Sequence, residues 1–562
     1  MKIMNEDNRN IILEEYENEF SYKKSKSNLN IQFNRVAFIF FIIFTISLIY
    51  SIQLLHLGSL QLNDKTKIAT LIKKNLRADI IDTNGNYLVK TVSSIDIGIN
   101  PVEVIDKKKL LINLQLIFPK KNYLEVKKKL ENKKFFYFEK KITAENYEKI
   151  MKLGDKSIKP EEKLTRIYPQ ENLFSHIIGQ IDDENNGISG IEKSFDLELK
   201  SINEPLQLTV DTDIQFLIRE ELIKFQPIFK NIGSAAILMD VNNGHILSMV
   251  SLPDFDLNKR ETIKDVNYIN RATKGVYELG SVFKTFTIAA GLNERVIEVD
   301  TEFIDLPKSL SCAKMPIREY DDKIPSDLTT EQILVRSGNI GSVRIAQKIG
   351  VEKFASFLKN LGLLDQIKFD IEEVGQPINF RWGKCKLATA SFGHGITTTP
   401  LQLAKAYSII TNGGYNINPT LIKKKSLKKN RVLKKDISKK INPILRKIVS
   451  TKDGTANFAN INGYEIGGKT GTAQKSINGI YSKEKINTFA AIFPASKPKF
   501  VLIVLMDEPK ANKEYVYYFK DGSGWKYKGN WRNTAGWTSV EVAGKIIEKI
   551  GPILATKYIE IN

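Results

Sequence analysis

Three short motifs, in a fixed order and far apart along the chain, constrain this sequence more than any other feature. They are Ser281-Val-Phe-Lys284, Ser337-Gly-Asn339 and Lys469-Thr-Gly-Thr472. Any one of them occurs by chance in many proteins of 562 residues. Together they indicate a serine acyl-transfer site that is assembled from the start of a helix, a loop and an edge strand.

The first motif supplies a candidate nucleophile and a candidate base. Gly280 permits a turn, which places Ser281 at the N-terminal end of an apolar run, 285–292, that predicts a helix. Lys284 lies one helical turn further on and projects beside the Ser281 hydroxyl. A serine hydroxyl needs a base, and a lysine can act as one when burial beside a second cation, Lys469, lowers its pKa.

The third motif predicts a binding site for the substrate. Lys469 and the hydroxyls of Thr470 and Thr472 are expected to hold a terminal carboxylate. Gly471 is expected to let a substrate backbone approach and add to the edge strand. The backbone N–H groups of Ser281 and Thr472 would then form an oxyanion hole.

One uncharged segment is long enough to cross a lipid bilayer. Residues 36–57 contain it, and its ~20 apolar residues match a hydrocarbon core of about 30 Å. The segment has no polar face, which argues against a buried core helix. Basic residues precede it and favour a cytoplasmic N-terminus, so that residues 61–562 would lie outside the cytoplasm: Lys23, Lys24, Lys26 and Arg35.

The composition excludes several other classes of protein. The net charge is +20, from 84 basic and 64 acidic residues, but no nucleic-acid-binding motif accompanies it. Surface solvation, or attraction to an anionic membrane or an acidic wall polymer, accounts for the excess. Cys312 and Cys385 have no metal-ligand spacing, and whether they pair is left open. No cofactor and no metal site are predicted.

Two further segments, with the three motifs, carry a family resemblance. Arg77-Ala-Asp-Ile-Ile-Asp-Thr-Asn-Gly85 and Arg166-Ile-Tyr-Pro169 are similar to the pedestal signatures of class B penicillin-binding proteins. The chain therefore resembles these bacterial peptidoglycan DD-transpeptidases. The resemblance implies an α+β fold: a penicillin-recognising serine transferase (β-lactamase-like) domain with an antiparallel sheet, preceded by an elongated pedestal and one transmembrane helix.

The expected organisation follows from the resemblance and from the local pattern. Asn242-Asn243-Gly244 is a strong hairpin signal between strands at 235–241 and 245–251. Three late strands, at 464–474, 487–493 and 500–506, would complete the sheet, and a helix from Ser539 would end at Gly551-Pro552. The expected divisions are a cytoplasmic tail 1–35, an anchor 36–57, a dimerisation-type pedestal 60–205, a linking segment 206–232 and a transpeptidase domain 233–556.

The resemblance also implies a reaction. Ser281 would attack the penultimate D-Ala carbonyl of a stem peptide, and the amine of a neighbouring stem would resolve the acyl-enzyme. Ser337 would shuttle a proton to the leaving nitrogen, while Asn339 would bind Lys284 and the substrate's peptide carbonyl. The implied partners are stem peptides or their lipid-linked precursor, β-lactams, the bacterial inner membrane, and septal proteins including an FtsW-type glycosyltransferase; nucleic acid is not among them.

Several alternatives remain at this stage. Asn339 and the segment Thr534-Ala-Gly-Trp537 favour the division-specific FtsI type over an elongation-type transpeptidase. A β-lactam hydrolase would need a Glu-x-x-Leu-Asn motif between Asn339 and Lys469, and none is present. The three intact motifs argue against an inactive scaffold or sensor. The acceptor amine and the oligomeric state are not determined by the sequence.

Overall fold

The computed structural model describes most of the chain outside the N-terminal tail. It covers residues 35–56 and 77–559, apart from 203, 260–264, 313–315, 424–429, 478–479, 511, 520 and 527–532. The predicted cytoplasmic tail, apart from Arg35, and the residues that join anchor to pedestal lie outside the described residues. Two compact units are present, 1–75 and 76–562.

In the first unit, a single apolar helix runs from Arg35 to His56. It has 22 residues, a mean hydropathy of 2.4 and no buried residues. At 1.5 Å per residue it is roughly 33 Å long, which is enough to cross a bilayer. This is the candidate membrane-spanning helix that residues 36–57 predict, and His56 is the last of those residues that the structure describes.

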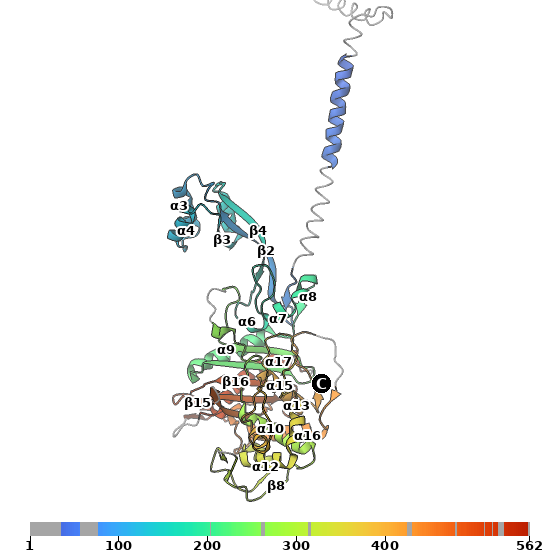
Figure 1. The fold of residues 1–562 in the computed structure, drawn as a ribbon, viewed down its shortest axis with the longest axis vertical. Helices are drawn as coiled ribbons and strands as arrows, with labels where there is room; N and C mark the ends of the chain where they lie inside the picture. Colours follow the sequence, from blue (N-terminus) through green and yellow to red (C-terminus); the bar gives the residue numbers. More distant parts are fainter. Residues whose placement is uncertain are drawn as a thin grey trace, which may run out of the picture. The chain divides into compact units, whose positions relative to one another are not determined.

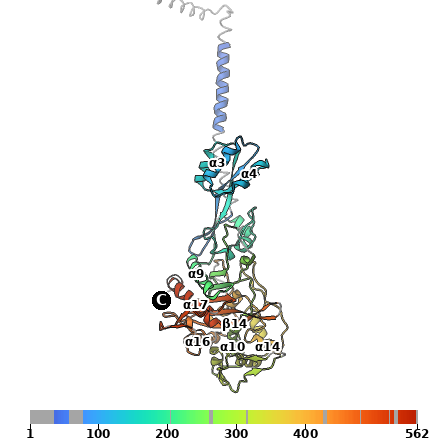
Figure 2. The ribbon, with the colours of Figure 1, turned by 90° about the vertical axis from the view of Figure 1, so that its left-hand side faces the viewer.

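A long antiparallel ribbon in the second unit carries a small apolar head (Figures 1 and 2). β2 pairs with β4 from Lys90 opposite Ile167 to Ile99 opposite Ile158, and β3 joins the far half of β2. The head has a core of its own, separate from the rest of the unit, around Ile97, Leu114 and Phe138. Its elements are β2 (Tyr87–Ile99), β3 (Phe136–Ile142), β4 (Ile158–Ile167), α3 (Lys107–Ile117), α4 (Tyr123–Glu131) and α5 (Ala144–Met151).

The base of the pedestal, by contrast, shares one apolar core with the C-terminal domain. Ile80, Phe174 and Ile191 are buried in the same cluster as the sheet and helices of that domain. The base consists of β1 (Ile80–Ile81), which pairs in parallel with β5 (Leu206–Gln207), and of α6 (Ser175–Ile178), α7 (Gly190–Ser194) and α8 (Asp196–Ser201). A shared core couples the two parts energetically, because neither can expose that surface alone.

A buried ion cluster holds the base together. Glu192 is fully buried and accepts from Arg77 Nε at 2.6 Å and from Arg166 Nε at 2.9 Å. The same Arg77 donates from Nη1 to Asp196 Oδ1 at 2.6 Å. Arg77 and Arg166 belong to the two pedestal signatures, so those signatures meet at one carboxylate that is distant from both in sequence.

The C-terminal domain is built on a five-stranded antiparallel sheet in the order β14-β15-β16-β6-β7. Two strands come from the start of the domain and three from its end, as predicted. The strands are β6 (Gly233–Asp240), β7 (Ile246–Leu252), β14 (Gly467–Ile477), β15 (Ile480–Phe493) and β16 (Phe500–Asp507). Asn242-Asn243-Gly244 forms the predicted turn between β6 and β7, and Gly244 has a φ of +78°.

Helices cover both faces of this sheet. α9 (Thr212–Phe229) and α17 (Ser539–Lys557) pack against each other and against β7, β15 and β16. On the other face α15 (Pro400–Thr411) packs on β16 and β6, and α16 (Asp436–Ser450) packs on β14. The helical region between β7 and β14 contains α10 (Phe283–Asn293), α11 (Thr330–Val335), α12 (Asn339–Ile349), α13 (Val351–Asn360) and α14 (Lys384–Ala390). Short two-stranded pairs complete the described elements: β8 (Glu302–Phe303) with β11 (Leu328–Thr329), β9 (Ser309–Leu310) with β10 (Ile317–Arg318), β12 (Tyr415–Asn416) with β13 (Asn430–Arg431), and β17 (Val516–Tyr518) with β18 (Gly524–Lys526).

Several predicted boundaries are wrong. β15 begins at Ile480 rather than at residue 487, because its ladder with β14 extends to Ile477 opposite Ile480. β14 begins at Gly467 rather than at residue 464, because Arg446 takes the carbonyl of Ile466 at 2.7 Å and the ladder with β15 starts after it. α17 continues through Gly551-Pro552 to Lys557. A proline costs a helix one hydrogen bond, but Leu554, which is 2 % exposed, adds apolar burial beyond it.

The two cysteines form a disulfide. Cys312 lies between β9 and β10, and Cys385 lies in α14, with their Cα atoms 5.5 Å apart and a sequence separation of 73. The pairing that the sequence left open is therefore present in the structure. The bond therefore ties Cys312, just after β9, to α14.

Replacing both cysteines by serine is expected to lower the free energy of unfolding by about 2–4 kcal/mol, because the cross-link restricts a long loop in the unfolded chain. Urea unfolding of the wild type and the double variant measures the difference. Reducing agent should lower the stability of the wild type toward that of the variant and leave the variant unchanged. Equal stability of the two oxidised proteins would contradict the prediction.

Candidate active site

The first motif lies at a helix start that is pressed against β14. A 3-10 turn, η3 (Gly280–Val282), precedes α10, and Ser281 is its central residue and is half-buried. Gly280 has a φ of +63°, and a Cβ atom there would lie 2.5 Å from the carbonyl oxygen of Thr472. Both facts require glycine before the serine. α10 is buried on all sides from Phe283 to Leu292, so Lys284 is fully enclosed.

The second motif surrounds the amine of this lysine with acceptors. Lys284 Nζ donates to the backbone carbonyl of Ser337 at 2.5 Å, to Asn339 Oδ1 at 2.6 Å and to Ser337 Oγ at 3.2 Å. Ser337 has a φ of +58°, a left-handed conformation that is uncommon outside glycine. Such residues are frequent at functional sites, where the surroundings hold the strained backbone.

The third motif reaches the same hydroxyl from the opposite side. Lys469 Nζ donates to Ser337 Oγ at 2.9 Å and to the backbone carbonyl of Thr470 at 3.0 Å. The Ser337 hydroxyl therefore lies between the amines of Lys284 and Lys469. Three segments that are distant in sequence thus converge on one oxygen atom.

Burial of the two lysines makes a full charge on both amines unfavourable. Loss of solvation lowers the pKa of Lys284 to about 7, although the nearby carboxylate of Glu319 acts in the opposite direction. Burial, together with repulsion from Lys284, holds the pKa of Lys469 well below its usual range. At neutral pH the pair can therefore hold a neutral amine, which is what a general base requires.

The predicted binding site for the substrate carboxylate lies along the outer edge of the sheet. β14 pairs only with β15 among the described strands, so its other edge is open for a further strand. Thr470 Oγ1 is 2.7 Å from Thr455 Oγ1, and Thr472 Oγ1 accepts from the backbone N–H of Ala535 at 2.9 Å. An accepting hydroxyl keeps its own proton, so Thr472 can still donate to a ligand.

Gly471 lies against the turn that carries Ser281. A Cβ atom at Gly471 would lie 2.1 Å from the carbonyl oxygen of Leu279 and 2.9 Å from Val282 Cγ1. The missing side chain therefore lets β14 approach the turn that carries Ser281, while the approach of a substrate backbone, the reason given for this glycine from sequence, stays a prediction. Its effect is to bring the first and third motifs together.

One residue of the site was missed by sequence reasoning. Glu319 accepts from the backbone N–H groups of Asn339 at 2.6 Å and Ile340 at 2.8 Å, the first two residues of α12. The Asn339 side chain also donates to the carbonyl of Arg318 at 2.7 Å. An acid at a helix N-terminus offsets the unpaired N–H groups and the helix dipole. No motif surrounds Glu319, so no sequence signal pointed to it.

Among the described residues, no three His, Cys, Asp or Glu side chains gather in a way that would hold a metal ion. The functional groups that do gather are the Ser337 hydroxyl, the Asn339 side chain and two buried lysines, and Ser281 lies one helical turn before Lys284 at the start of α10. This set suits acyl transfer through a serine, in which a neutral lysine removes the proton of the nucleophile.

Comparisons with known proteins agree with this class of site. Residues 234–520 match the family of penicillin-binding protein transpeptidase domains, and residues 72–224 match the penicillin-binding protein dimerisation domain. A probable peptidoglycan D,D-transpeptidase FtsI of Caulobacter vibrioides is 30% identical over 498 residues, covering 86% of this chain and 82% of the relative. The FtsI of Buchnera aphidicola is 28% identical over 548 residues, covering 89% and 94%.

The fold is also found in a solved structure. A crystal structure of penicillin-binding protein 3 from Mycobacterium, complexed with aztreonam, superposes with a TM-score of 0.65 at 20% identity and covers 85% of this chain and 96% of that one. Fold, site and relatives together define a penicillin-binding transpeptidase with a pedestal. The chain belongs to the class B penicillin-binding proteins of the FtsI type, the peptidoglycan D,D-transpeptidases of cell division.

Proposed function

We propose that Ser281 is the nucleophile through which this D,D-transpeptidase forms its acyl-enzyme, and that Lys284 is its base. The observation that carries the proposal is the convergence of Lys284 and Lys469 on the Ser337 hydroxyl, at 3.2 and 2.9 Å. A base in this position must be neutral, and burial lowers the pKa of Lys284 to about 7. The same nucleophile would be the target of β-lactams.

The proton of the nucleophile is transferred along the hydrogen bonds that the two lysines form. Neutral Lys284 takes the proton of Ser281 as Oγ attacks the penultimate D-Ala carbonyl of a stem peptide. Ser337 then passes a proton to the leaving amine, drawing on the lysine beside it. Asn339, which accepts from Lys284 at 2.6 Å, holds the amine in place. An amine of a second stem peptide attacks the ester, reverses the proton transfers and releases the cross-linked product.

The third motif provides binding and electrostatic stabilisation. Lys469 with Thr470 and Thr472 would hold the terminal carboxylate of the donor peptide, while the peptide backbone pairs with the open edge of β14. Gly471, by bringing β14 against the turn of Ser281, sets the spacing of the two N–H groups, of Ser281 and Thr472, that would stabilise the oxyanion. Each such donor typically contributes about 3 kcal/mol to the transition state.

Acylation by a fluorescent penicillin is expected to accelerate as the pH rises through about 7 and to level off above it, because Lys284 acts in its neutral form and its pKa is about 7. The Glu319 carboxylate favours the charged form of Lys284, so Glu319→Gln removes that support. The midpoint of the profile should therefore move to lower pH in the variant. Second-order acylation rates between pH 5 and 9 measure both effects.

The matched control is Glu302→Gln, an exposed acid on β8, which should keep the profile of the wild type. Glu319→Ala should in addition reduce the plateau rate, because the first N–H groups of α12 lose both acceptors and Asn339 is less firmly held. A flat profile from pH 5 to 9 would contradict Lys284 as the base. A midpoint that moves to higher pH in Glu319→Gln would contradict the electrostatic argument.

We propose further that the catalytic domain works in the periplasm, on lipid-linked precursor or nascent wall, beside an FtsW-type glycosyltransferase and other septal proteins. The apolar helix Arg35–His56 and the basic residues before it support this orientation. A reporter enzyme that is active only in the periplasm, fused after Asn562, should give full activity. Activity only from a reporter that needs the cytoplasm would reverse the orientation.

A further inference from the structure

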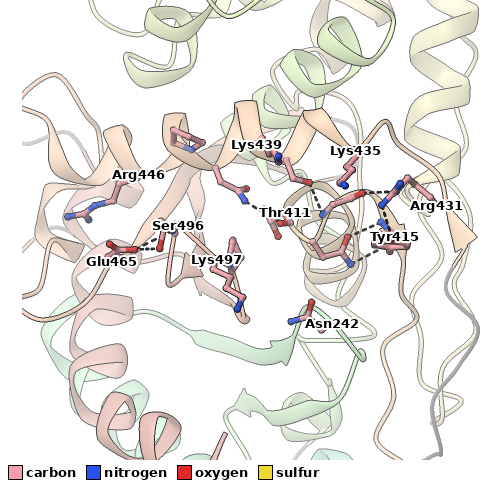
Figure 3. A pocket seen from close by; sticks show the side chains of 17 residues that line it. Asn242, Thr411, Tyr415, Arg431, Lys435, Lys439, Arg446, Glu465, Ser496 and Lys497 are labelled. Carbon is pink, nitrogen blue, oxygen red and sulfur yellow. Dashed lines mark hydrogen bonds between the residues drawn. The ribbon is translucent and has the colours of Figure 1, made fainter. Parts of the chain in front are cut away.

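A second cavity lies at the end of the catalytic sheet and is lined by none of the three motifs. It is enclosed by α16, the end of α15, the turn between β15 and β16 at 494–498, and the β6–β7 hairpin at Asn242 (Figure 3). Its volume is about 730 Å³. Sites for small organic ligands typically measure about 300–1,000 Å³, so the cavity is large enough for one.

The lining of this cavity is strongly basic. Five of its residues carry positive charge and only Glu465 carries negative charge. The basic residues are Arg431, Lys435, Lys439, Arg446 and Lys497. Glu465 is itself engaged with the hydroxyl and the backbone N–H of Ser496 at the rim. A cavity with this excess of charge attracts anions.

The basic side chains fall into two groups. Arg431 is held by the Tyr415 hydroxyl at 2.6 Å, and Arg446 by the carbonyl of Ile466 at 2.7 Å, so both belong to the framework. Lys435, Lys439 and Lys497 are exposed and form no ion pair with any described residue. Figure 3 shows Lys497 between the Glu465 side and the Tyr415 side of the cavity. Of the three exposed lysines, Lys439 and Lys497 are the two that we assign to the charge of a ligand.

An unsatisfied polar group also faces the cavity. Asn442 is 7 % exposed; its Nδ2 donates to the carbonyl of Thr411 at 3.2 Å, but its Oδ1 has no hydrogen-bond partner. An unpaired buried carbonyl costs about 1–3 kcal/mol, and native proteins rarely leave one without reason. Since Asn442 lines the cavity, a ligand that carries an N–H or O–H donor would satisfy it.

We propose that this cavity, whose residues are named above, binds a short acidic peptide at a site separate from the catalytic cleft. Carboxylates of the peptide pair with Lys439 and Lys497, and a peptide N–H donates to Asn442 Oδ1. The apolar surface of Pro443 and Pro498 accommodates small aliphatic side chains. A bare inorganic anion would use the lysines but would leave the amide of Asn442 unpaired. The inference does not depend on which residue is the nucleophile.

Fluorescence anisotropy with the full chain in detergent tests the proposal. The probe is fluorescein-labelled Ala-Glu-Glu-Ala, and the neutral peptide Ala-Gln-Gln-Ala is its counterpart. The neutral peptide should bind at least about tenfold more weakly, and the double variant K439Q/K497Q should weaken the acidic probe by a similar factor. Asn442→Ala should weaken it severalfold. Lys440→Gln is the matched control, because Lys440 pairs with Glu298 and Asp436 outside the cavity and should bind as the wild type does.

Three results would overturn the proposal. The first is equal affinity of wild type and K439Q/K497Q, with both variants folded as judged by unchanged penicillin labelling. The second is complete loss of peptide binding after Ser281 has been acylated, which would place the peptide in the catalytic cleft. The third is displacement of the probe by inorganic pyrophosphate in excess of what sodium chloride of equal ionic strength achieves, which would indicate a simple anion site. The same peptide built from D-amino acids distinguishes a wall-type ligand from a protein segment, and binding of either form supports the site.

Discussion

Replacing Ser281 by alanine is expected to abolish covalent labelling by fluorescent penicillin and to leave the fold intact. Ser281 is half-buried in the middle of a 3-10 turn, and loss of its hydroxyl creates no large cavity in the core. Substitutions of this kind usually change the free energy of unfolding by no more than about 0.5 kcal/mol. A labelling gel and a thermal melt of the same preparation measure the two effects together.

The matched control is Ser356→Ala, an exposed serine on α13, which should label as the wild type does. Full labelling of Ser281→Ala would reject Ser281 as the nucleophile. The lifetime of the wild-type band adds a second criterion. A transpeptidase should keep its penicilloyl ester for the length of the experiment, whereas a band that disappears rapidly would mean a β-lactam hydrolase.

Replacing Glu192 by glutamine is expected to cost the protein about 3–5 kcal/mol of stability, the largest loss we predict for a single substitution. Glu192 is fully buried and pairs with Arg77 and Arg166, which are 1 % and 5 % exposed. The variant keeps the volume of the side chain but leaves two buried guanidinium groups short of one counter-charge. Urea unfolding followed by far-UV circular dichroism gives the difference in free energy.

Because the pedestal base shares a core with the C-terminal domain, the loss of stability should also destabilise the catalytic domain. Penicillin labelling of Glu192→Gln should therefore fail at a lower temperature than that of the wild type, although Glu192 lies outside the three motifs. Glu198→Gln, an exposed acid on α8, is the matched control and should be neutral. A loss below about 1 kcal/mol in Glu192→Gln would mean that solvent or Asp196 compensates the arginines.

Much of the candidate site could be predicted because its parts are local. Ser281 and Lys284 are one helical turn apart, and the glycine before them is needed for a turn that the chain makes within three residues. The hairpin at Asn242-Asn243-Gly244 and the alternation of helix and strand patterns likewise depend on near neighbours. Such features are encoded in spacing and in backbone preference, which a sequence displays directly.

Contacts between distant segments were decided by the tertiary structure. The convergence of Lys284 and Lys469 on Ser337, the Glu319 carboxylate at the start of α12 and the Cys312–Cys385 bond each depend on how separate elements pack. Gly471 is an instructive case: its residue type was foreseen, but its neighbour, the carbonyl of Leu279, was not.

The physical reason is the range of the interactions involved. Helix starts, turns and strand periodicity arise from sterics and hydrogen bonds within a few residues, so the sequence by itself determined the three motifs, the apolar helix and the segments that form the strands of the sheet. The pKa of a buried lysine depends on which other segments exclude water from its amine. The free-energy cost of burying an ion cluster depends on the same kind of contact. Only the packed fold determines which residues are neighbours. It therefore also determines the lowered pKa of Lys284 and the ion cluster at Glu192.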